Sequence, residues 1–287
     1  MKIGAVLPHN EIGTDSGALK AYVQGVESLG TDHLLAYDHV LGADARRPGG
    51  FNGPYDKDIQ FHEPFTTFAF FAGLTTTLRF TTAVLILPQR QTALVAKQAA
   101  QLAILSDNRF SMGIGTGWNQ VEYEALNEDF TNRGKRQAEQ VKLMRRLWTE
   151  ETLDYQGNFH RVPRAGINPR PSLTIPILFG GTAPIVLKRC ARLGDGWVPI
   201  MGPTPTAAKA IEVIKIHRRE LGLSWEGFSI QAQAQYSGGN PDRWAGHADK
   251  WRVLGATHLA VATHNAGKTD VDGHLRRIEE YLSAVDQ

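Results

Sequence analysis

The chain has 287 residues, of which 42% are hydrophobic and 21% are charged. These proportions are typical of a folded globular protein and exclude a disordered chain. The 31 Lys and Arg residues nearly balance the 29 Asp and Glu residues and leave a formal charge of +2, so the composition gives no electrostatic reason to expect nucleic acid or a membrane surface as a partner.

Cysteine content and the N-terminal segment narrow the class further. The only cysteine, Cys190, cannot form an internal disulfide or support a thiol-rich metal site. The N-terminal segment reaches Pro8 too soon for the apolar core of a secretory signal. No apolar run approaches the roughly 18 residues that a membrane span needs. We therefore expect a cytoplasmic protein with a large core.

Short apolar runs alternate with helical patterns along the whole chain. The runs that predict strands are residues 3–7, 33–37, 78–87, 110–114, 176–179, 196–199, 228–235 and 258–263. The patterns that predict helices are residues 17–29, 64–75, 93–105, 133–148, 183–193, 206–221, 242–254 and 271–285. Residues 153–162 alternate around a turn and predict a small added hairpin.

This alternation predicts an α/β fold with a parallel sheet. Eight strand–helix units in a chain of this length favour one closed (β/α)8 TIM barrel spanning residues 1–287. The alternative, an open doubly wound sheet, more often has five or six strands. Two segments, 38–63 and 158–175, exceed ordinary loop length, and long loops in a compact fold are usually lids or binding loops.

The residues at the carboxyl ends of the strands should carry the chemistry of a barrel. Asp38 is the only acid among them, which argues against a paired-carboxylate hydrolase and against a zinc site built from the loop histidines. No serine lies in a nucleophile-elbow setting. Two glycine-rich loops, 113–117 and 179–182, instead favour a large flat or anionic ligand. An organic cofactor fits these loops better than a metal.

Several segments together resemble the luciferase-like monooxygenase superfamily. The most specific is residues 78–88, Leu-Arg-Phe-Thr-Thr-Ala-Val-Leu-Ile-Leu-Pro. The other matching segments are residues 96–98, 105–109, 113–118, 122–123, 133–134, 147–151, 179–181 and 194–197. The overall pattern is most similar to the F420-dependent oxidoreductase branch. The resemblance covers about residues 1–200 and implies a (β/α)8 barrel, usually a homodimer, that uses coenzyme F420 or FMN.

The resemblance assigns the acid–base role to His39, which matches a histidine that stands near the reactive ring in the F420-dependent enzymes. Its neighbour Asp38 belongs to the same Asp-His pair, and we expect Asp38 either to hold the imidazole or to cap a loop. An imidazole suits proton transfer because it titrates near neutral pH.

The cofactor site is also implied by position. Ala83-Val84 matches a pair joined by a non-prolyl cis peptide that bulges against the ring. Two glycine-rich loops match the segments that contact the ring, its side chain and its phosphate-bearing tail, and their residues are Gly115, Thr116, Gly117, Gly180, Gly181 and Thr182. Arg90 either holds an anionic tail or contacts only solvent.

Phe51, Tyr55 and Phe61, together with Phe65, either line a substrate pocket or hold the long loop in place. Trp118 is either a wall of the pocket or part of the core. We take Phe51, Tyr55, Phe61 and Trp118 as the predicted substrate pocket. The sugar-phosphate dehydrogenases of the F420 branch carry a Trp and a Glu where this chain has Ala43 and Trp118. That departure argues against a sugar-phosphate substrate.

We therefore predict an F420-dependent oxidoreductase that transfers hydride to or from a small organic substrate, with His39 as acid or base. The first alternative is an FMN-dependent two-component monooxygenase that uses O2 and a partner reductase supplying reduced flavin. Oxygen consumption tied to product would separate these two, since a deazaflavin reacts poorly with O2. The second alternative is a non-catalytic flavin-binding barrel. The substrate and the direction of the reaction stay open.

Overall fold

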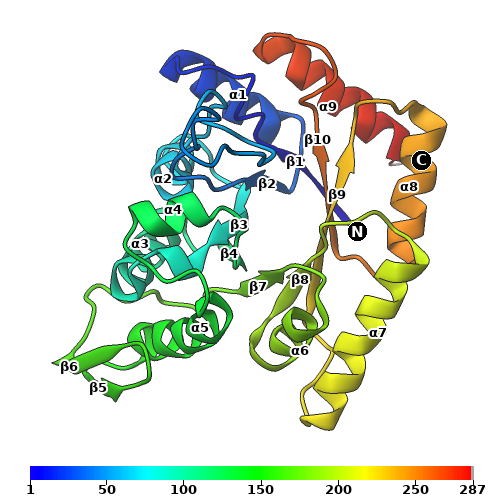
Figure 1. The fold of residues 1–287 in the computed structure, drawn as a ribbon. Coiled ribbons are helices and arrows are strands. Elements are labelled where there is room, and N and C mark those ends of the chain that lie inside the picture. Colours follow the sequence, from blue (N-terminus) through cyan, green and yellow to red (C-terminus); the bar gives the residue numbers. More distant parts are fainter. Residues whose placement is uncertain (286–287) are drawn as a thin grey trace.

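Eight parallel strands close into a barrel in the order β1-β10-β9-β8-β7-β4-β3-β2 (Figure 1). The structure is a computed structural model that describes residues 1–285. The barrel strands are β1 Lys2–Val6, β2 His33–Ala36, β3 Arg79–Ile86, β4 Phe110–Gly115, β7 Ile177–Gly180, β8 Gly196–Val198, β9 Ser229–Gln235 and β10 His258–Ala262. The predicted (β/α)8 barrel is confirmed.

Helices surround the barrel (Figure 1). They are α1 Ser16–Ser28, α2 Pro64–Ala72, the 3-10 turn η1 Leu87–Gln89, α3 Thr92–Leu105, α4 Gln120–Ala125, α5 Arg133–Thr149, α6 Pro184–Leu193, α7 Pro205–Glu220, α8 Pro241–Val253 and α9 Val271–Val285. The sequence did not predict η1 or α4, because elements this short show no helical period. No helix within the described residues is long and apolar enough to cross a membrane.

The predicted hairpin is present as β5 Leu153–Gln156 and β6 Arg161–Ala165, which pair antiparallel. It lies outside the ring of helices, beside α5 (Figure 1). The hairpin adds no strand to the barrel and forms part of the outer surface of the molecule.

Proline and capping side chains start several helices where the chain leaves the strands. Proline occupies the first turn of α2, α6, α7 and α8, where its missing N–H costs nothing. Glu63, Thr204 and Asn240 cap three of these helices by accepting a hydrogen bond from a first-turn N–H. Ala183, before α6, offers no such side chain. The N-terminus of α6 therefore keeps amide donors that a ligand can use.

The barrel interior is filled by side chains that alternate with those facing the helices. Near the mouth this interior cluster is formed by Val6, Leu35, Ala83, Leu178, Val198, Ala260 and Ala262. At the opposite end the interior contains polar side chains. The His33 ring there lies 2.9 Å from the Gln231 side-chain amide nitrogen. The interior is thus a packed core rather than a ligand cavity.

Candidate active site

His39 lies just beyond the end of β2, inside a cage of aromatic side chains. Its ring centroid is 4.6 Å from that of Phe61, 5.1 Å from that of Tyr55 and 5.8 Å from that of Trp118. The long β2–α2 loop supplies Tyr55 and Phe61, and the β4–α4 loop supplies Trp118. Phe51 packs on Trp118 at 6.0 Å and forms an outer layer. The structure therefore brings three of the four predicted pocket residues to the imidazole.

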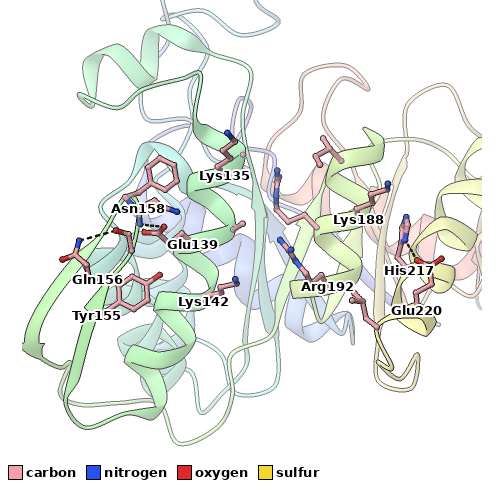
Figure 2. Close-up of a pocket in the computed structure, with 17 residues that line it drawn as sticks. Lys135, Glu139, Lys142, Tyr155, Gln156, Asn158, Lys188, Arg192, His217 and Glu220 are labelled. Atoms are coloured by element: carbon pink, nitrogen blue, oxygen red, sulfur yellow. Dashed lines mark hydrogen bonds and ion pairs between the residues drawn. The ribbon is translucent and has the colours of Figure 1, made fainter.

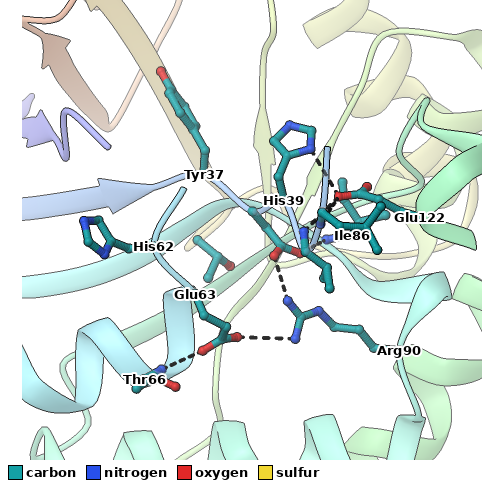
Figure 3. A network of polar contacts seen from close by, with 12 residues as sticks. Tyr37, His39, His62, Glu63, Thr66, Ile86, Arg90 and Glu122 are labelled. Atoms are coloured by element: carbon teal, nitrogen blue, oxygen red, sulfur yellow. Dashed lines mark hydrogen bonds and ion pairs between the residues drawn. The ribbon is translucent and has the colours of Figure 1, made fainter. Parts of the chain in front are cut away.

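A residue without a role in the sequence analysis, Glu122, holds the other side of this ring. Its Oε1 lies 3.4 Å from His39 Nδ1 and accepts hydrogen bonds from the Val40 and Leu41 N–H groups at 2.8 and 3.3 Å (Figure 3). The side chain is almost completely buried. Asn119 caps α4 and its amide donates to the Leu41 carbonyl. The short helix α4 thereby clamps the segment that carries His39.

Asp38 faces away from His39 and binds the β3 side of the barrel. Its carboxylate accepts from the Ile86 N–H at 2.8 Å and from the Arg90 guanidinium at 2.7 Å (Figure 3). Burial raises the pKa of Asp38, but both oxygens accept hydrogen bonds, one from a cation, and these contacts hold the carboxylate ionised. The expectation that Asp38 holds the imidazole is wrong; Glu122 lies there instead.

Arg90 is likewise part of the frame of the site. Besides Asp38 it contacts Glu63 at 3.3 Å, and its side chain is only 14% exposed. Burial is the largest single influence and lowers the pKa of Arg90, but the charges and hydrogen bonds of Asp38 and Glu63 together outweigh burial, so the net shift is upward. Neither sequence-based alternative for Arg90, an anionic tail or solvent, describes this pairing.

The Ala83–Val84 peptide bond is cis, as the resemblance implied. The ladder between β3 and β4 shifts register at this point. The Val84 side chain fills the space that Gly115 and Gly180 leave open: a Cβ on either glycine would lie 2.5 or 2.7 Å from a Val84 methyl carbon. A larger residue at either position would therefore displace the Val84 bulge, so packing requires glycine at both positions.

The remaining residues of the two glycine-rich loops lie around this bulge. Gly117 has a φ of +65° and Gly181 a φ of +119°, conformations that favour glycine. The Thr116 carbonyl accepts from the Tyr123 hydroxyl at 2.8 Å, and the Gly181 carbonyl accepts from the Trp197 indole at 2.8 Å. Thr182 follows directly and leads into α6. That these residues contact a cofactor stays a prediction.

A cavity of about 600 Å³ opens at the barrel mouth. It is bordered by Ala83 of the cis peptide, by Tyr37 and Tyr55, and by the loop after β8. On its floor the Tyr37 hydroxyl donates to the Gln233 side-chain oxygen at 2.9 Å. A smaller cavity of about 170 Å³ lies beside His39 and is walled by Tyr55 and Phe61. The mouth therefore offers adjoining spaces of ligand size.

His9, at the end of β1, is a second histidine of the mouth. Its Nε2 accepts from the Tyr37 N–H at 3.0 Å. Burial lowers the pKa of His9 to about 3, with smaller contributions from His62, His264 and His39. His9 is therefore neutral near pH 7 and belongs to the frame that holds Tyr37, whereas His39 borders the smaller cavity.

Comparison with known proteins identifies the class. The chain matches the luciferase-like monooxygenase family over residues 1–245 and belongs to that family. A Mycobacterium tuberculosis protein described only as uncharacterized is 38% identical over 222 residues, which are 74% of this chain and 77% of that protein. Members of the family are oxidoreductases, including monooxygenases.

A relative with a named activity and a solved structure complete the comparison. The F420-dependent hydroxymycolic acid dehydrogenase of Mycobacterium tuberculosis is 30% identical over 202 residues, 68% of this chain and 52% of that protein. The crystal structure of the monooxygenase RslO1 from Streptomyces bottropensis superposes with a TM-score of 0.82 at 18% identity, covering 99% of this chain and 98% of that one. At this identity the likeness supports the fold alone.

Proposed function

We propose that the protein is an F420-dependent oxidoreductase that transfers hydride to or from a small organic alcohol, ketone or enone, with His39 as the proton-transferring residue. The observation that carries the proposal is the placement of His39, held by Glu122 and enclosed by aromatic rings at the edge of the mouth cavities. The similarity to an F420-dependent dehydrogenase, 30% identical over 202 residues, supports this chemistry.

The residues at the mouth fit a flat ring with an anionic tail. The Val84 bulge presents a fixed surface because Gly115 and Gly180 receive its side chain. Ala83 borders the cavity of about 600 Å³. The uncapped N-terminus of α6, just after Gly180, Gly181 and Thr182, would take the phosphate of the tail. When bound, the deazaflavin would supply the hydride-accepting or hydride-donating centre.

Side chains at the mouth would transfer the proton and exclude water. With Nδ1 facing Glu122, the free nitrogen of His39 is Nε2. Nε2 would take the proton of a substrate hydroxyl as hydride leaves the carbon, or return it to a carbonyl oxygen in the reverse reaction. Tyr55, Phe61 and Trp118 would exclude water around this proton transfer and contact apolar parts of the substrate. Asp38 would position the strand end through Arg90 and Ile86.

The test is a binding titration of the purified protein with F420 and with FMN, followed by turnover assays. Micromolar binding of F420, no binding of FMN and oxidation of an alcohol without O2 uptake are the expected results. Binding of FMN together with O2 consumption tied to product would replace the proposal by the monooxygenase that the family description favours. Tight binding without any turnover would indicate a non-catalytic flavin-binding barrel.

We also propose that the chain forms a homodimer through α2 and α3. Helix α2 has no charged residue and exposes Phe70 at 42%, and α3 exposes Leu94 and Leu105 at 53% each with Lys97 as its only charge. Such an apolar helix pair is better explained by burial against a second copy than by solvent. Light scattering should give a dimer that Phe70→Glu dissociates, and a wild-type monomer would refute this interface.

A further inference from the structure

The largest cavity described in the structure is a groove on the outer wall of the barrel. It measures about 1050 Å³ and lies between α5 with the β5–β6 hairpin on one side and α6 with the end of α7 on the other (Figure 2). None of the sequence-predicted site residues lines it. The groove is thus separate from the mouth, and its chemistry needs its own explanation.

The groove is basic although the chain as a whole is nearly neutral. Its cations are Lys135 and Lys142 on α5, and Lys188, Arg189 and Arg192 on α6. Within residues 1–285 none of these five side chains forms an ion pair. Facing rows of like charge on neighbouring helices repel one another, which an anionic ligand would relieve.

The two acids of the groove are already engaged and do not neutralise these cations. Glu139 accepts from the Asn158 and Phe159 N–H groups at 2.8 and 2.9 Å and pairs with His160, so it fastens the hairpin to α5 (Figure 2). Glu220 pairs with His217 at 2.8 Å. The groove therefore keeps an unneutralised positive charge.

One cation is built into the wall of the groove. Arg189 is half-buried and donates to the Gln137 side-chain oxygen at 3.2 Å. It lies so close to Gly134 that a Cβ there would be 2.7 Å from its terminal nitrogen. Arg189 is consequently held in place, while Lys188 and Arg192 line the groove from the same helix, Arg192 pointing toward α5 and Lys188 toward α7 (Figure 2).

Spacing and apolar content point to an elongated ligand. Lys188 and Arg192 are one helical turn apart, about 6 Å along the axis. Side chains on one face of an extended peptide repeat at about 6.7 Å, so alternate acidic residues would meet this row. Ile185, Phe159 and Leu221 line the same groove and are 64%, 38% and 50% exposed. These apolar side chains would contact apolar residues of the same segment.

We propose that this groove binds an extended segment of a partner protein in which acidic side chains alternate with apolar ones. The proposal does not depend on the oxidoreductase function. Charge complementarity with five unpaired cations supplies the attraction. Because of the three exposed apolar side chains, the groove would bind such a segment more tightly than a purely charged ligand.

The test is fluorescence anisotropy with a short labelled peptide in which Glu alternates with Leu or Ala, titrated with the full-length protein. We expect saturable binding that weakens as salt is raised. The double variant Lys188→Glu/Arg192→Glu should bind at least about tenfold more weakly. The matched control is Lys209→Glu/Arg276→Glu, which changes the net charge equally at exposed positions outside the groove and should bind like the wild type.

Three results would overturn the proposal. The first is no binding at low salt, and the second is equal loss in the groove and control variants, which would show only a response to net charge. The third is displacement of the peptide by inorganic tripolyphosphate at lower concentration than by unlabelled peptide, which would make the groove a site for small polyanions. The substituted side chains are exposed, so circular dichroism should show an unchanged fold in every variant.

Discussion

The two ends of the barrel each contain a histidine that contacts a carboxylate, yet their surroundings differ. At the mouth, His39 faces Glu122 and borders a cavity. At the opposite end, His33 is 1% exposed, lies 3.3 Å from Asp32 and contacts Gln231 across the interior. A histidine–carboxylate pair is thus open to a ligand at one end of the barrel and enclosed by protein at the other.

This difference shows that residue type alone does not indicate chemistry. The ring of His258 packs against that of His33 with centroids 5.2 Å apart, and Gly4 leaves room for both the His33 ring and its carbonyl. The closed end therefore behaves as a polar plug whose hydrogen bonds stabilise the barrel. The mouth end carries comparable groups with space beside them, which is what a proton-transfer site requires.

Removing the mouth histidine should have the largest effect on activity. His39→Ala deletes the only proposed proton donor and acceptor, so kcat should fall by about 10²–10⁴-fold with cofactor affinity nearly unchanged. Single-turnover kinetics and a binding titration on the same preparation check this. Unchanged turnover with intact cofactor binding would remove His39 from the mechanism.

Removing the histidine at the closed end should affect stability instead. His33→Ala leaves the Gln231 amide with only its 3.3 Å hydrogen bond to the Ala232 carbonyl and opens a cavity, which should lower the free energy of unfolding by about 2–4 kcal/mol. Urea denaturation measures this loss. Turnover per folded molecule should equal that of the wild type; a large fall in kcat at full stability would show that the two ends are not separate.

Acid should weaken the closed end in a defined pH window. Burial lowers the pKa of His33, and burial with the neighbouring His33 lowers the pKa of His258 from 6.5 to about 4, while Asp32 opposes and Lys2 and Arg79 assist. Below pH 6.5 these two histidines become protonated in the unfolded chain but stay neutral in the folded chain, so lowering the pH favours unfolding. The free energy of unfolding should therefore fall between pH 6.5 and about 4, with His258 alone contributing about 3 kcal/mol.

Urea denaturation at a series of pH values measures this dependence. His258→Gln removes one of the two groups and should make the fall with decreasing pH shallower. A wild-type stability that stays level across this window would mean that the histidine pair accepts protons in the folded state, and the closed end would then not be a neutral plug.

The sequence predicted the barrel well because its signal is local. Each apolar run is bounded by turn residues, and eight runs of strand length alternate with helical patterns, so strand identity needs no knowledge of distant contacts. The cis peptide at Ala83–Val84 has no local signal of its own. It was accessible only because the surrounding segment resembles a known family.

The site was predicted in outline but not in its pairings. The ring centroids of Tyr55, Phe61 and Trp118 lie 4.6 to 5.8 Å from that of His39, while the roles of these residues stay predictions. Glu122 was missed because 82 residues separate it from Val40, whose N–H it accepts. Which carboxylate meets which cation depends on the paths of the β2–α2 and β4–α4 loops, and composition and period do not determine those paths. The adjacent Asp38 was therefore assigned the part that Glu122 takes.

Removing the charge of Glu122 should have the smallest of the predicted effects. Glu122→Gln keeps a side-chain oxygen to accept from the Val40 and Leu41 N–H groups but removes the charge beside His39 Nδ1. A residue that orients a functional histidine typically contributes about 10–100-fold, so kcat should fall by that factor with little change in KM. The fall should appear in kcat per folded molecule, because Glu122→Gln alters the contact that orients the imidazole and keeps the hydrogen bonds to the backbone.

The same helix provides the control. Glu124 is 58% exposed and contacts Arg47 at 3.7 Å on the outer side of α4, so Glu124→Gln removes an equal charge without touching His39. A purely structural role for Glu122 would lower stability and leave kcat per folded molecule unchanged, since the remaining folded molecules would be normal. A lower kcat per folded molecule in Glu122→Gln alone would instead establish that the open end differs from the closed end through the carboxylate that orients its histidine beside a cavity.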